Sequence, residues 1–167
     1  MEREIRPEEL SENVFDLIGN QWLLVAANDG EKSNAMTASW GSLGVMWGKP
    51  SAFIVIRPQR YTKEFLDRVQ TFSLSIFPKE KKEIMNYMGT VSGRDEDKIA
   101  KCGLTERIVD GAPVFAESRI TLICRKQFAG PMEESSFCDP SVVERWYPQK
   151  DFHTLYIGRI EKVIVND

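Results

Sequence analysis

The chain has 167 residues, of which 42% are apolar and 28% are charged, and its formal net charge is −3. This is the composition of an ordinary globular protein, and the chain is long enough to bury a core without disulfides or metal. We therefore expect a single domain over residues 1–167. The near balance of charges argues against a protein that coats nucleic acid. No apolar run approaches the roughly 18 residues of a membrane span, and Met1–Glu4 is not followed by the apolar segment of a secretory signal.

The cysteine and histidine content limits the chemistry of the chain. Cys102, Cys124 and Cys138 form no C-x-x-C pair, and the chain holds one histidine, so we expect no metal site. Three free thiols without an export signal indicate a cytoplasmic protein. A catalytic cysteine remains an open alternative, although none of the usual signatures surrounds these three residues.

In the first half of the chain, short helices are expected to alternate with strands. A helix is predicted from Pro7 to Gly19, because proline suits a first turn and apolar residues recur at helical spacing. Apolar strands are predicted from Trp22 to Ala27 and, as a central strand, from Ala52 to Ile56. Thr62 is expected to cap a helix that runs from Lys63 to about Val69.

A strand and a second helix are predicted next. Apolar residues alternate with Thr71, Ser73 and Ser75 up to Ile76, which indicates a strand of period two. The helix is expected to open at Pro78 and to close at Gly89. Ile84 and Met88, four residues apart, are expected on its inner face.

The last part of the chain is mostly β in character. Ser92–Asp95 has the form of a capping box for a short helix that ends at Gly103. Apolar and polar residues alternate over residues 119–125, which indicates a strand. Thr154–Val165 is a long β-rich run in which the alternation of apolar and polar residues slips at Gly158, as at a bulge. Six or seven strands without regularly spaced helices disfavour a doubly wound parallel sheet. We expect a mainly β fold, a closed antiparallel barrel with helices on its flank.

Three segments have the composition of ligand-binding loops, although the glycine-rich nucleotide signatures and the G-x-S-x-G elbow are absent. The first, Asn34–Gly41 followed by Gly44–Pro50, sets small and hydroxyl residues beside two tryptophans. Small residues let the backbone approach a flat ligand, whose edge can then bond N–H and hydroxyl groups. The alternative is an edge strand and turn whose tryptophans belong to the core.

The second and third segments are basic helix starts. Arg57–Thr62 brackets a turn with two arginines, and Thr90–Lys98 offers a hydroxyl, a glycine, an arginine and a lysine. Free N–H groups at a helix start, with basic side chains nearby, can bind phosphate. The alternatives are solvated surface arginines with a routine cap, and a capping box with solvated charges. Together the three segments suit a ligand with one anionic and one flat end, such as a mononucleotide-like cofactor.

In this order and spacing, the segments resemble those of the flavin reductase-like proteins with the FMN-binding split barrel, including the flavoredoxin group. The resemblance runs from about Asn13 to Val165. The segments that carry it are Asn34–Gly41 with Trp47–Pro50, Arg57–Thr62, Thr90–Lys98 and Asp151–Gly158. It implies a six-stranded antiparallel split β-barrel with flanking short helices, which forms a homodimer with one FMN per subunit near the interface. It also implies electron transfer from NADH or NADPH to a flavin.

The resemblance also assigns roles to individual residues. The residues that match the stretch lining the isoalloxazine ring and nearby ribityl chain are Met36, Thr37, Ser39 and Trp40. Those that match the stretch between ring and phosphate are Arg57, Pro58, Arg60, Tyr61 and Thr62. Those that match the phosphate-side loop and helix start are Ser92, Gly93, Arg94 and Lys98. His153 matches the family histidine near the flavin face where nicotinamide can stack.

The role of His153 has an alternative, a hydrogen-bonded structural residue just before a strand. Because the flavin carries the chemistry of hydride transfer, a histidine there would orient nicotinamide or help to protonate reduced flavin. Trp146–Pro148, just before it, either covers the flavin or packs as a hinge loop.

We therefore expect an NAD(P)H-dependent flavin oxidoreductase that passes electrons to flavin or to a downstream acceptor. One alternative is a non-catalytic FMN electron carrier that exchanges electrons with a redox protein, and another is a barrel that binds no flavin. The expected partners are a second copy of the chain and a monooxygenase or other redox protein, with no nucleic acid and no membrane.

Overall fold

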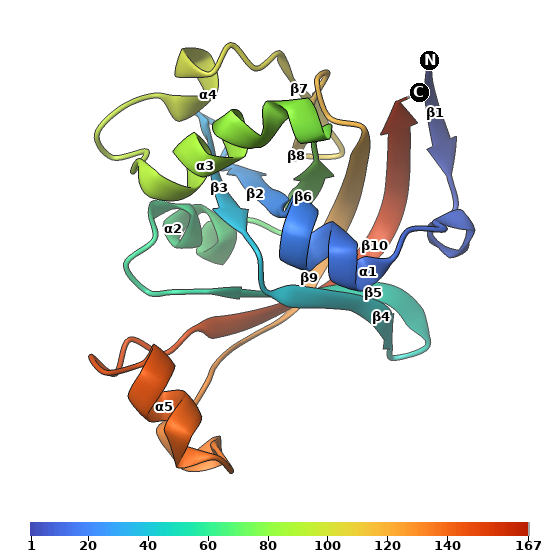
Figure 1. The fold of residues 1–167 in the computed structure, drawn as a ribbon. Helices are drawn as coiled ribbons and strands as arrows, with labels where there is room; N and C mark the ends of the chain where they lie inside the picture. Colours follow the sequence, from blue (N-terminus) through green and yellow to red (C-terminus); the bar gives the residue numbers. More distant parts are fainter. Residues whose placement is uncertain (167) are drawn as a thin grey trace.

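A computed structural model describes residues 1–166 as an antiparallel sheet that curls around one core, with short helices on its flank (Figure 1). The main sheet runs in the order β3-β2-β6-β9-β10-β5-β4, and β1 pairs with β10. Its strands are β1 (Glu2–Ile5), β2 (Leu23–Asn28), β3 (Ser33–Ala38), β4 (Gly41–Met46), β5 (Lys49–Ile56), β6 (Thr71–Ile76), β9 (Ile120–Pro131) and β10 (Thr154–Asn166). A separate hairpin joins β7 (Glu106–Val109) and β8 (Ala112–Phe115).

The mainly β, antiparallel expectation is confirmed, but the number of strands is larger than expected. The main sheet has eight strands rather than six. The added strands are short or lie at an edge, and β4, with sequence GSLGVM, has the glycines of a loop. Its pairing with the strongly apolar β5 makes it a strand. Tertiary pairing thus overrides a weak local preference.

The helices are short. They are α1 (Val14–Asp16), α2 (Tyr61–Arg68), α3 (Lys82–Thr90), α4 (Lys98–Lys101) and α5 (Pro140–Trp146), with 3₁₀ turns η1 (Pro7–Glu9), η3 (Lys79–Lys81) and η4 (Glu134–Ser136) and a π turn η2 (Leu17–Gln21). Helices α2, α3 and α4 all contact β3 and lie on the same side of the sheet in Figure 1. Across residues 1–166, no helix is long and apolar enough to cross a membrane.

The helix predicted from Pro7 to Gly19 is wrong as one continuous element. It divides into η1, α1 and η2, with extended residues between the first two. Asn13 has an extended backbone, and its side chain accepts hydrogen bonds from the N–H groups of Phe15 and Asp16. An asparagine in this role begins a new helix, which explains the break.

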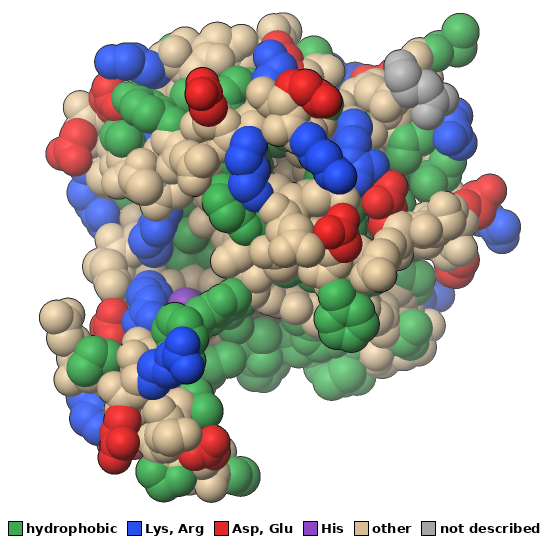
Figure 2. Space-filling model, in the orientation of Figure 1, with side chains coloured by type: hydrophobic (Ala, Val, Ile, Leu, Met, Phe, Trp, Pro, Cys, Tyr) green, Lys and Arg blue, Asp and Glu red, His purple; other side chains and the backbone are tan. Residues whose placement is uncertain are grey.

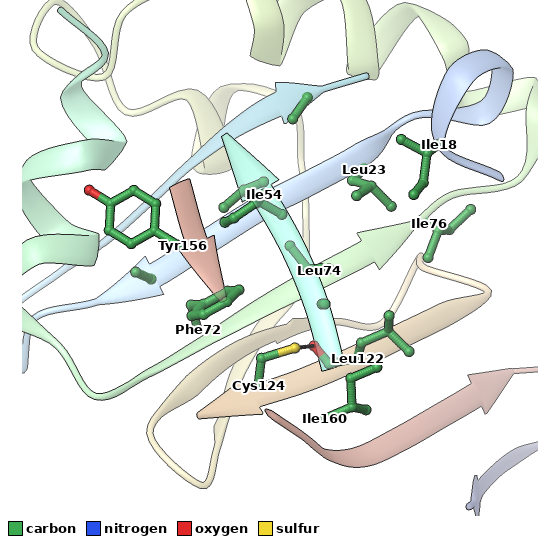
Figure 3. Close-up of a cluster of buried hydrophobic side chains, with 14 of the residues drawn as sticks. Ile18, Leu23, Ile54, Phe72, Leu74, Ile76, Leu122, Cys124, Tyr156 and Ile160 are labelled. Carbon is green, nitrogen blue, oxygen red and sulfur yellow. Dashed lines mark hydrogen bonds between the residues drawn. The ribbon is translucent and has the colours of Figure 1, made fainter. Parts of the chain in front are cut away.

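The core lies between the layers of the curled sheet. Side chains from β2, β5, β6, β9 and β10 converge there, among them Leu23, Ile54, Phe72, Leu122 and Tyr156 (Figure 3). Burying each such side chain contributes on the order of 1.5–3 kcal/mol to stability. The Tyr156 hydroxyl is the polar exception, and it donates to the Asp67 carboxylate at the end of α2.

Strand β6 lies where predicted, but its polar face is buried. All six residues are buried, including Ser73 and Ser75. The Ser73 hydroxyl donates to the Pro113 carbonyl, and the Ser75 hydroxyl lies 3.1 Å from that of Thr121. The β7–β8 hairpin therefore packs on the hydroxyl-bearing face of β6.

Two predicted helix caps are displaced. Helix α2 begins at Tyr61 with Arg60 as its cap residue, so Thr62 lies inside the helix and does not cap it. Ser92 accepts a hydrogen bond from the Arg94 N–H within a turn, and the helix that follows begins only at Lys98. Asp97 is its cap, because its carboxylate accepts from the Ala100 N–H.

Other predicted helix features are closer to the structure. Gly103 ends α4 as expected, with a φ of +64°. The second helix is α3, which starts after η3 and not at Pro78. Met85 and Met88 are its buried residues, while Ile84 is only partly buried.

The end of the β9–β10 ladder carries a projecting arm, which we define as residues 132–152. The arm contains η4 and α5 and stands away from the body in Figure 1. The Met132 N–H donates to the His153 carbonyl at its base. The ladder that supports it has the predicted bulge, because the pairing register shifts between Ile157 and Gly158.

Gly158 is a position where only glycine fits without rearrangement. A Cβ there would lie 2.7 Å from Phe72 Cζ and 2.9 Å from Cys124 Cβ. We expect Gly158→Ala to lower the free energy of unfolding by about 1–3 kcal/mol through overpacking. Gly44→Ala is the control, because its Cβ would meet only Phe53 Cε2 at 4.0 Å and should change stability by less than about 0.5 kcal/mol. Thermal or urea unfolding measures both, and equal stabilities of the two variants would contradict the prediction.

Candidate functional site

Most of the predicted site residues surround two cavities that adjoin each other. The aromatic cavity, of about 230 Å³, lies between β3, β5 and the base of the arm. Its predicted lining residues are Met36, Thr37, Ser39, Trp40, Arg57, Arg60 and His153. The cationic cavity, of about 180 Å³, lies between β3, the start of α2 and the turn after α3. Its predicted lining residues are Met36, Arg60, Tyr61, Thr62, Ser92, Gly93 and Lys98.

The two cavities share Met36 and Arg60, so they adjoin and together offer a site with two chemically different ends. Segments far apart in the sequence meet here because the sheet curls. Strand β3 stands at one end of the strand order and β5 near the other, yet residues of β3 and of the turn after β5 line both cavities. Figure 2 shows the single histidine at the bottom of the hollow between the body and the arm.

Two predicted residues, Pro58 and Arg94, line neither cavity. Pro58 is exposed in the turn between β5 and α2. The Arg94 guanidinium pairs with Glu64 at 2.9 Å, donates to the Gln59 carbonyl and lies 4.8 Å from the Tyr61 ring centre. These contacts hold the Arg94 guanidinium against the start of α2.

Arg57 lines the aromatic cavity, but its guanidinium is used to hold the arm. It forms an ion pair with Asp151 at 2.9 Å and donates to the Trp146 carbonyl at 2.9 Å. It also lies 5.0 Å from the centre of the Tyr147 ring. Gln59 reinforces this attachment through a 2.9 Å hydrogen bond to the same Asp151 carboxylate.

Three rings meet at the mouth of the aromatic cavity. Trp40 and Trp146 pack edge to face with ring centres 4.9 Å apart, and Trp40 lies 5.3 Å from the His153 ring. Trp146 remains 41% exposed. Of the two roles expected for this segment, a cover of the flavin or a hinge loop, neither is decided by this position, but Trp146 does form part of the cavity wall.

His153 is buried below this aromatic rim. Its Nδ1 atom lies 2.7 Å from the Tyr147 hydroxyl. Burial, reinforced by the Arg57 charge and opposed by Asp151, lowers the pKa of His153 to about 4. The ring is therefore neutral at neutral pH.

The cationic cavity holds two positive groups without acidic partners. Within residues 1–166, neither Arg60 nor Lys98 forms an ion pair. Lys98 is only 3% exposed, and its ammonium donates to the Met88 carbonyl at 2.9 Å. Burial, together with the neighbouring Arg60 charge, lowers the pKa of Lys98 to about 8. Such uncompensated charge favours an anion at this end of the site.

Asn34 is a site residue that the sequence reasoning did not single out. Its amide donates to the Thr62 hydroxyl at 2.8 Å, which fixes the start of α2 against β3. Gly93 packs so closely on Asn34 that a Cβ would lie 2.0 Å from its Oδ1 atom. The place of Asn34 at the start of the Asn34–Gly41 segment was the sequence feature that could have indicated it. Motif spacing alone does not show which segment the Asn34 amide will contact.

A larger hollow of about 740 Å³ adjoins the cationic cavity and shares Asn34, Tyr61, Gly93 and Lys98 with it. Its wall includes the acidic residues Glu31, Asp95, Glu96, Asp97 and Glu106 beside the basic residues Lys32, Arg94, Lys98 and Arg107. Mixed charge of this kind suits solvent better than an anionic ligand. The pair of smaller cavities, with separate aromatic and cationic ends, is therefore the stronger candidate site despite its size.

Comparisons with known proteins identify the family of the chain and the fold that it shares. The sequence of residues 15–167 matches the family described as "Flavin reductase like domain". No curated protein matches the sequence.

Several solved structures share the fold. An FMN-binding domain of a flavin reductase-like enzyme from Shewanella baltica OS155 has a TM-score of 0.70 and 17% identity over 99% of this chain and 77% of its own. The flavoredoxin of Desulfovibrio vulgaris (Miyazaki F) has a TM-score of 0.69 and 24% identity over 87% and 69% of the two chains. An NADH:FAD oxidoreductase from Streptomyces globisporus C-1027 has a TM-score of 0.64 and 16% identity over 86% and 73%.

At these identities the structural likeness establishes the fold, a split barrel, and leaves the activity open. The family match covers nearly the whole chain and includes both cavities. The chain therefore belongs to the flavin reductase-like domain family.

Proposed function

We propose that the chain binds FMN across the two adjoining cavities and passes electrons from NADH or NADPH to flavin or to a downstream acceptor. The observation that carries the proposal is the pair Arg60 and Lys98, two cations without acidic partners among residues 1–166, at one end of a site whose other end is aromatic. A phosphate monoester carries a charge of about −1.5 to −2 at neutral pH, which these two cations would balance.

The residues present fit the cofactor at both ends. Arg60 and Lys98 would hold the phosphate, and the Ser92–Gly93 turn offers a hydroxyl and closely approaching backbone beside it. Met36 and Thr37 would lie along the ring, with Trp40 and His153 at the mouth. Bound FMN would supply the capacity to accept a hydride and release electrons, and the protein would supply binding, orientation and exclusion of water.

A non-catalytic electron carrier that serves a redox protein, such as a monooxygenase, is the second candidate. The exposed Trp146 at the cavity mouth favours it, because a partner protein could approach the site there. Flavoredoxins and an NADH:FAD oxidoreductase both occur among the structural relatives, so the fold supports either role. The three free cysteines support the further proposal that the protein works in the cytoplasm.

We also propose that the chain forms a homodimer through the outer face of its sheet. Because Ile54 and Ile56 point into the core, Phe53 and Val55 lie on the opposite face. Their cross-strand neighbours in β10 are Ile157 and Leu155, and Phe128 of β9 pairs with Ile157. Apolar side chains also gather along the lower side of the body in Figure 2. Val55 lines the aromatic cavity, so a second copy on this face would lie beside the site.

The first prediction concerns the phosphate end. FMN should bind more tightly than riboflavin, and Arg60→Met should weaken FMN binding at least tenfold while riboflavin binding stays nearly constant. A charge-assisted hydrogen bond contributes about 1.5–3 kcal/mol, and 1.4 kcal/mol corresponds to tenfold. Flavin fluorescence titration measures both affinities. Arg125→Met is the control, because it removes the same charge from an ion pair with Glu161 elsewhere on the sheet. Equal losses for FMN and riboflavin would contradict the assignment.

The second prediction concerns turnover. Protein mixed with NADH or NADPH and excess FMN should consume the nicotinamide, as followed by its absorbance. A protein that holds FMN but consumes neither nicotinamide would instead be the electron carrier.

The same assay tests His153. His153→Ala should leave FMN affinity nearly intact and lower kcat/KM for the reduced nicotinamide tenfold to a hundredfold, about 1.4–2.7 kcal/mol. A thermal melt of the same variant provides the control. An unchanged rate with a lowered melting temperature would show that His153 is structural.

A separate prediction concerns the dimer. Light scattering should report a homodimer, and Phe128→Glu should shift it toward monomer, because Phe128 is 43% exposed on the proposed interface. Ile108→Glu is the matched control, since Ile108 is 49% exposed on the separate β7–β8 hairpin. A protein that stays monomeric with FMN bound, or a Phe128→Glu variant that stays dimeric, would exclude this interface.

A further inference from the structure

We infer that Tyr147 is a positioning residue for His153: its hydroxyl donates to Nδ1, fixes the ring as the Nε2–H tautomer and directs that N–H into the aromatic cavity. The expected effect of Tyr147 on turnover rests on the proposed function. The tautomer assigned to His153 rests on the geometry alone.

The direction of the hydrogen bond follows from the acceptors around Tyr147. A hydroxyl has one proton to donate, and the oxygen lies 2.7 Å from His153 Nδ1 and 4.0 Å from Met132 Sδ. A thioether is a weak acceptor, whereas an unprotonated imidazole nitrogen is a strong one. The hydroxyl proton is therefore best placed toward Nδ1, which leaves the proton of the neutral ring on Nε2.

The other ring nitrogen is open to the cavity. Among the described residues, no hydrogen bond is formed by His153 Nε2. In the same part of the chain, every buried side-chain nitrogen or oxygen has a partner, so Nε2 must reach accessible surface. His153 is only 7% exposed and lines the aromatic cavity. The accessible surface at Nε2 is therefore the cavity itself.

Packing on several sides fixes the position of the Tyr147 hydroxyl. The Tyr147 ring centre lies 4.8 Å from Phe152, 5.6 Å from Phe137 and 5.0 Å from the Arg57 guanidinium. Its backbone N–H donates to the Val143 carbonyl at the end of α5. The arm thus presents this hydroxyl to His153 as part of a packed cluster.

The charged and titratable groups around His153 are Tyr147 from the end of α5, Asp151 from the arm, and Arg57 and Arg60 from the turn after β5. Burial, reinforced by Arg57 and opposed by Asp151, holds the pKa of His153 near 4. Burial also raises the pKa of Tyr147, so its hydroxyl keeps its proton. The ring becomes charged only as the pH falls through about 4, and it presents the same neutral N–H donor throughout the neutral range.

A neutral N–H donor restricts what His153 can do. It can bond a carbonyl oxygen, such as that of a nicotinamide carboxamide or a flavin ring, and so hold an acceptor group in the cavity. It is a poor proton donor to a reacting atom at neutral pH, because the ring is not protonated on both nitrogens. Of the two roles expected for His153, orientation is therefore favoured over protonation.

The test uses the fact that the chain has a single histidine. Protein labelled with [¹⁵N]histidine and carrying no histidine tag gives one imidazole, whose two nitrogen shifts report tautomer and charge. We expect the Nε2–H pattern at neutral pH and a titration midpoint near 4. In Tyr147→Phe both tautomers should be populated. The pH midpoint of the His153 titration should rise by about 0.5 to 1 unit, because the variant loses one hydrogen bond that stabilises the neutral ring.

Phe137→Leu is the matched control, because it loosens the packing of the Tyr147 ring and leaves the hydroxyl in place. It should speed amide hydrogen exchange in the arm without altering the tautomer. An Nδ1–H pattern or a charged ring in the unmodified protein at pH 7 would overturn the inference. An unchanged pattern in Tyr147→Phe would overturn it as well.

Kinetics complete the test and separate it from the proposed function. Tyr147→Phe should lower kcat/KM for the reduced nicotinamide about threefold to tenfold, with FMN affinity and its riboflavin ratio unchanged. If the unmodified protein shows the expected tautomer but consumes no nicotinamide, the proposed enzymatic function is refuted and the tautomer assignment stands. Turnover that is unaffected while the tautomer changes would overturn the positioning role.

Discussion

The attachment of the arm through Arg57 is the interaction on which the aromatic cavity depends. Arg57 lies at the end of β5, and its guanidinium contacts Asp151, the Trp146 carbonyl and the Tyr147 ring, all of them in the arm. A planar fork with several donors can satisfy such partners together, which a lysine ammonium cannot do with the same geometry. Without this attachment, the cavity would lose the wall that carries Trp146 and the support of His153.

The cationic cavity shows a second constraint: a residue that favours anion binding lowers the stability of the folded protein. Lys98 is buried at a cost, since its pKa falls to about 8 from an ordinary 10.5. Because the unfolded chain binds the Lys98 proton more tightly, this residue destabilises the folded state below about pH 8, and the loss fades as the pH rises toward 10.5. An anion at this end would offset that cost, so ligand binding and folding stability are coupled at one side chain.

The sequence specified the sheet better than the details of the site. Apolar and β-branched runs located β5 and β10, and the slip at Gly158 located the bulge, because these features depend on local pattern. Thr62 was misassigned as a cap because its hydroxyl serves a distant partner, Asn34. The attachment of Arg57 to the arm could not be predicted from the sequence either. Spacing places a residue in a turn, but it does not determine where its long side chain points.

The geometry of the arm has a consequence for how access to the site could vary among related chains. The arm leaves the sheet and returns to it at one point, where Met132 and His153 are joined by a backbone hydrogen bond. Among the described residues, its side-chain attachments to the body are polar and aromatic contacts made by Arg57, Gln59, Trp40 and His153, none of which belongs to the main hydrophobic core. Opening such a unit costs much less free energy than unfolding the sheet beneath it. Substitutions in residues 132–152 can therefore reshape the entrance, in length or in chemistry, while the folding of the barrel stays nearly independent of them.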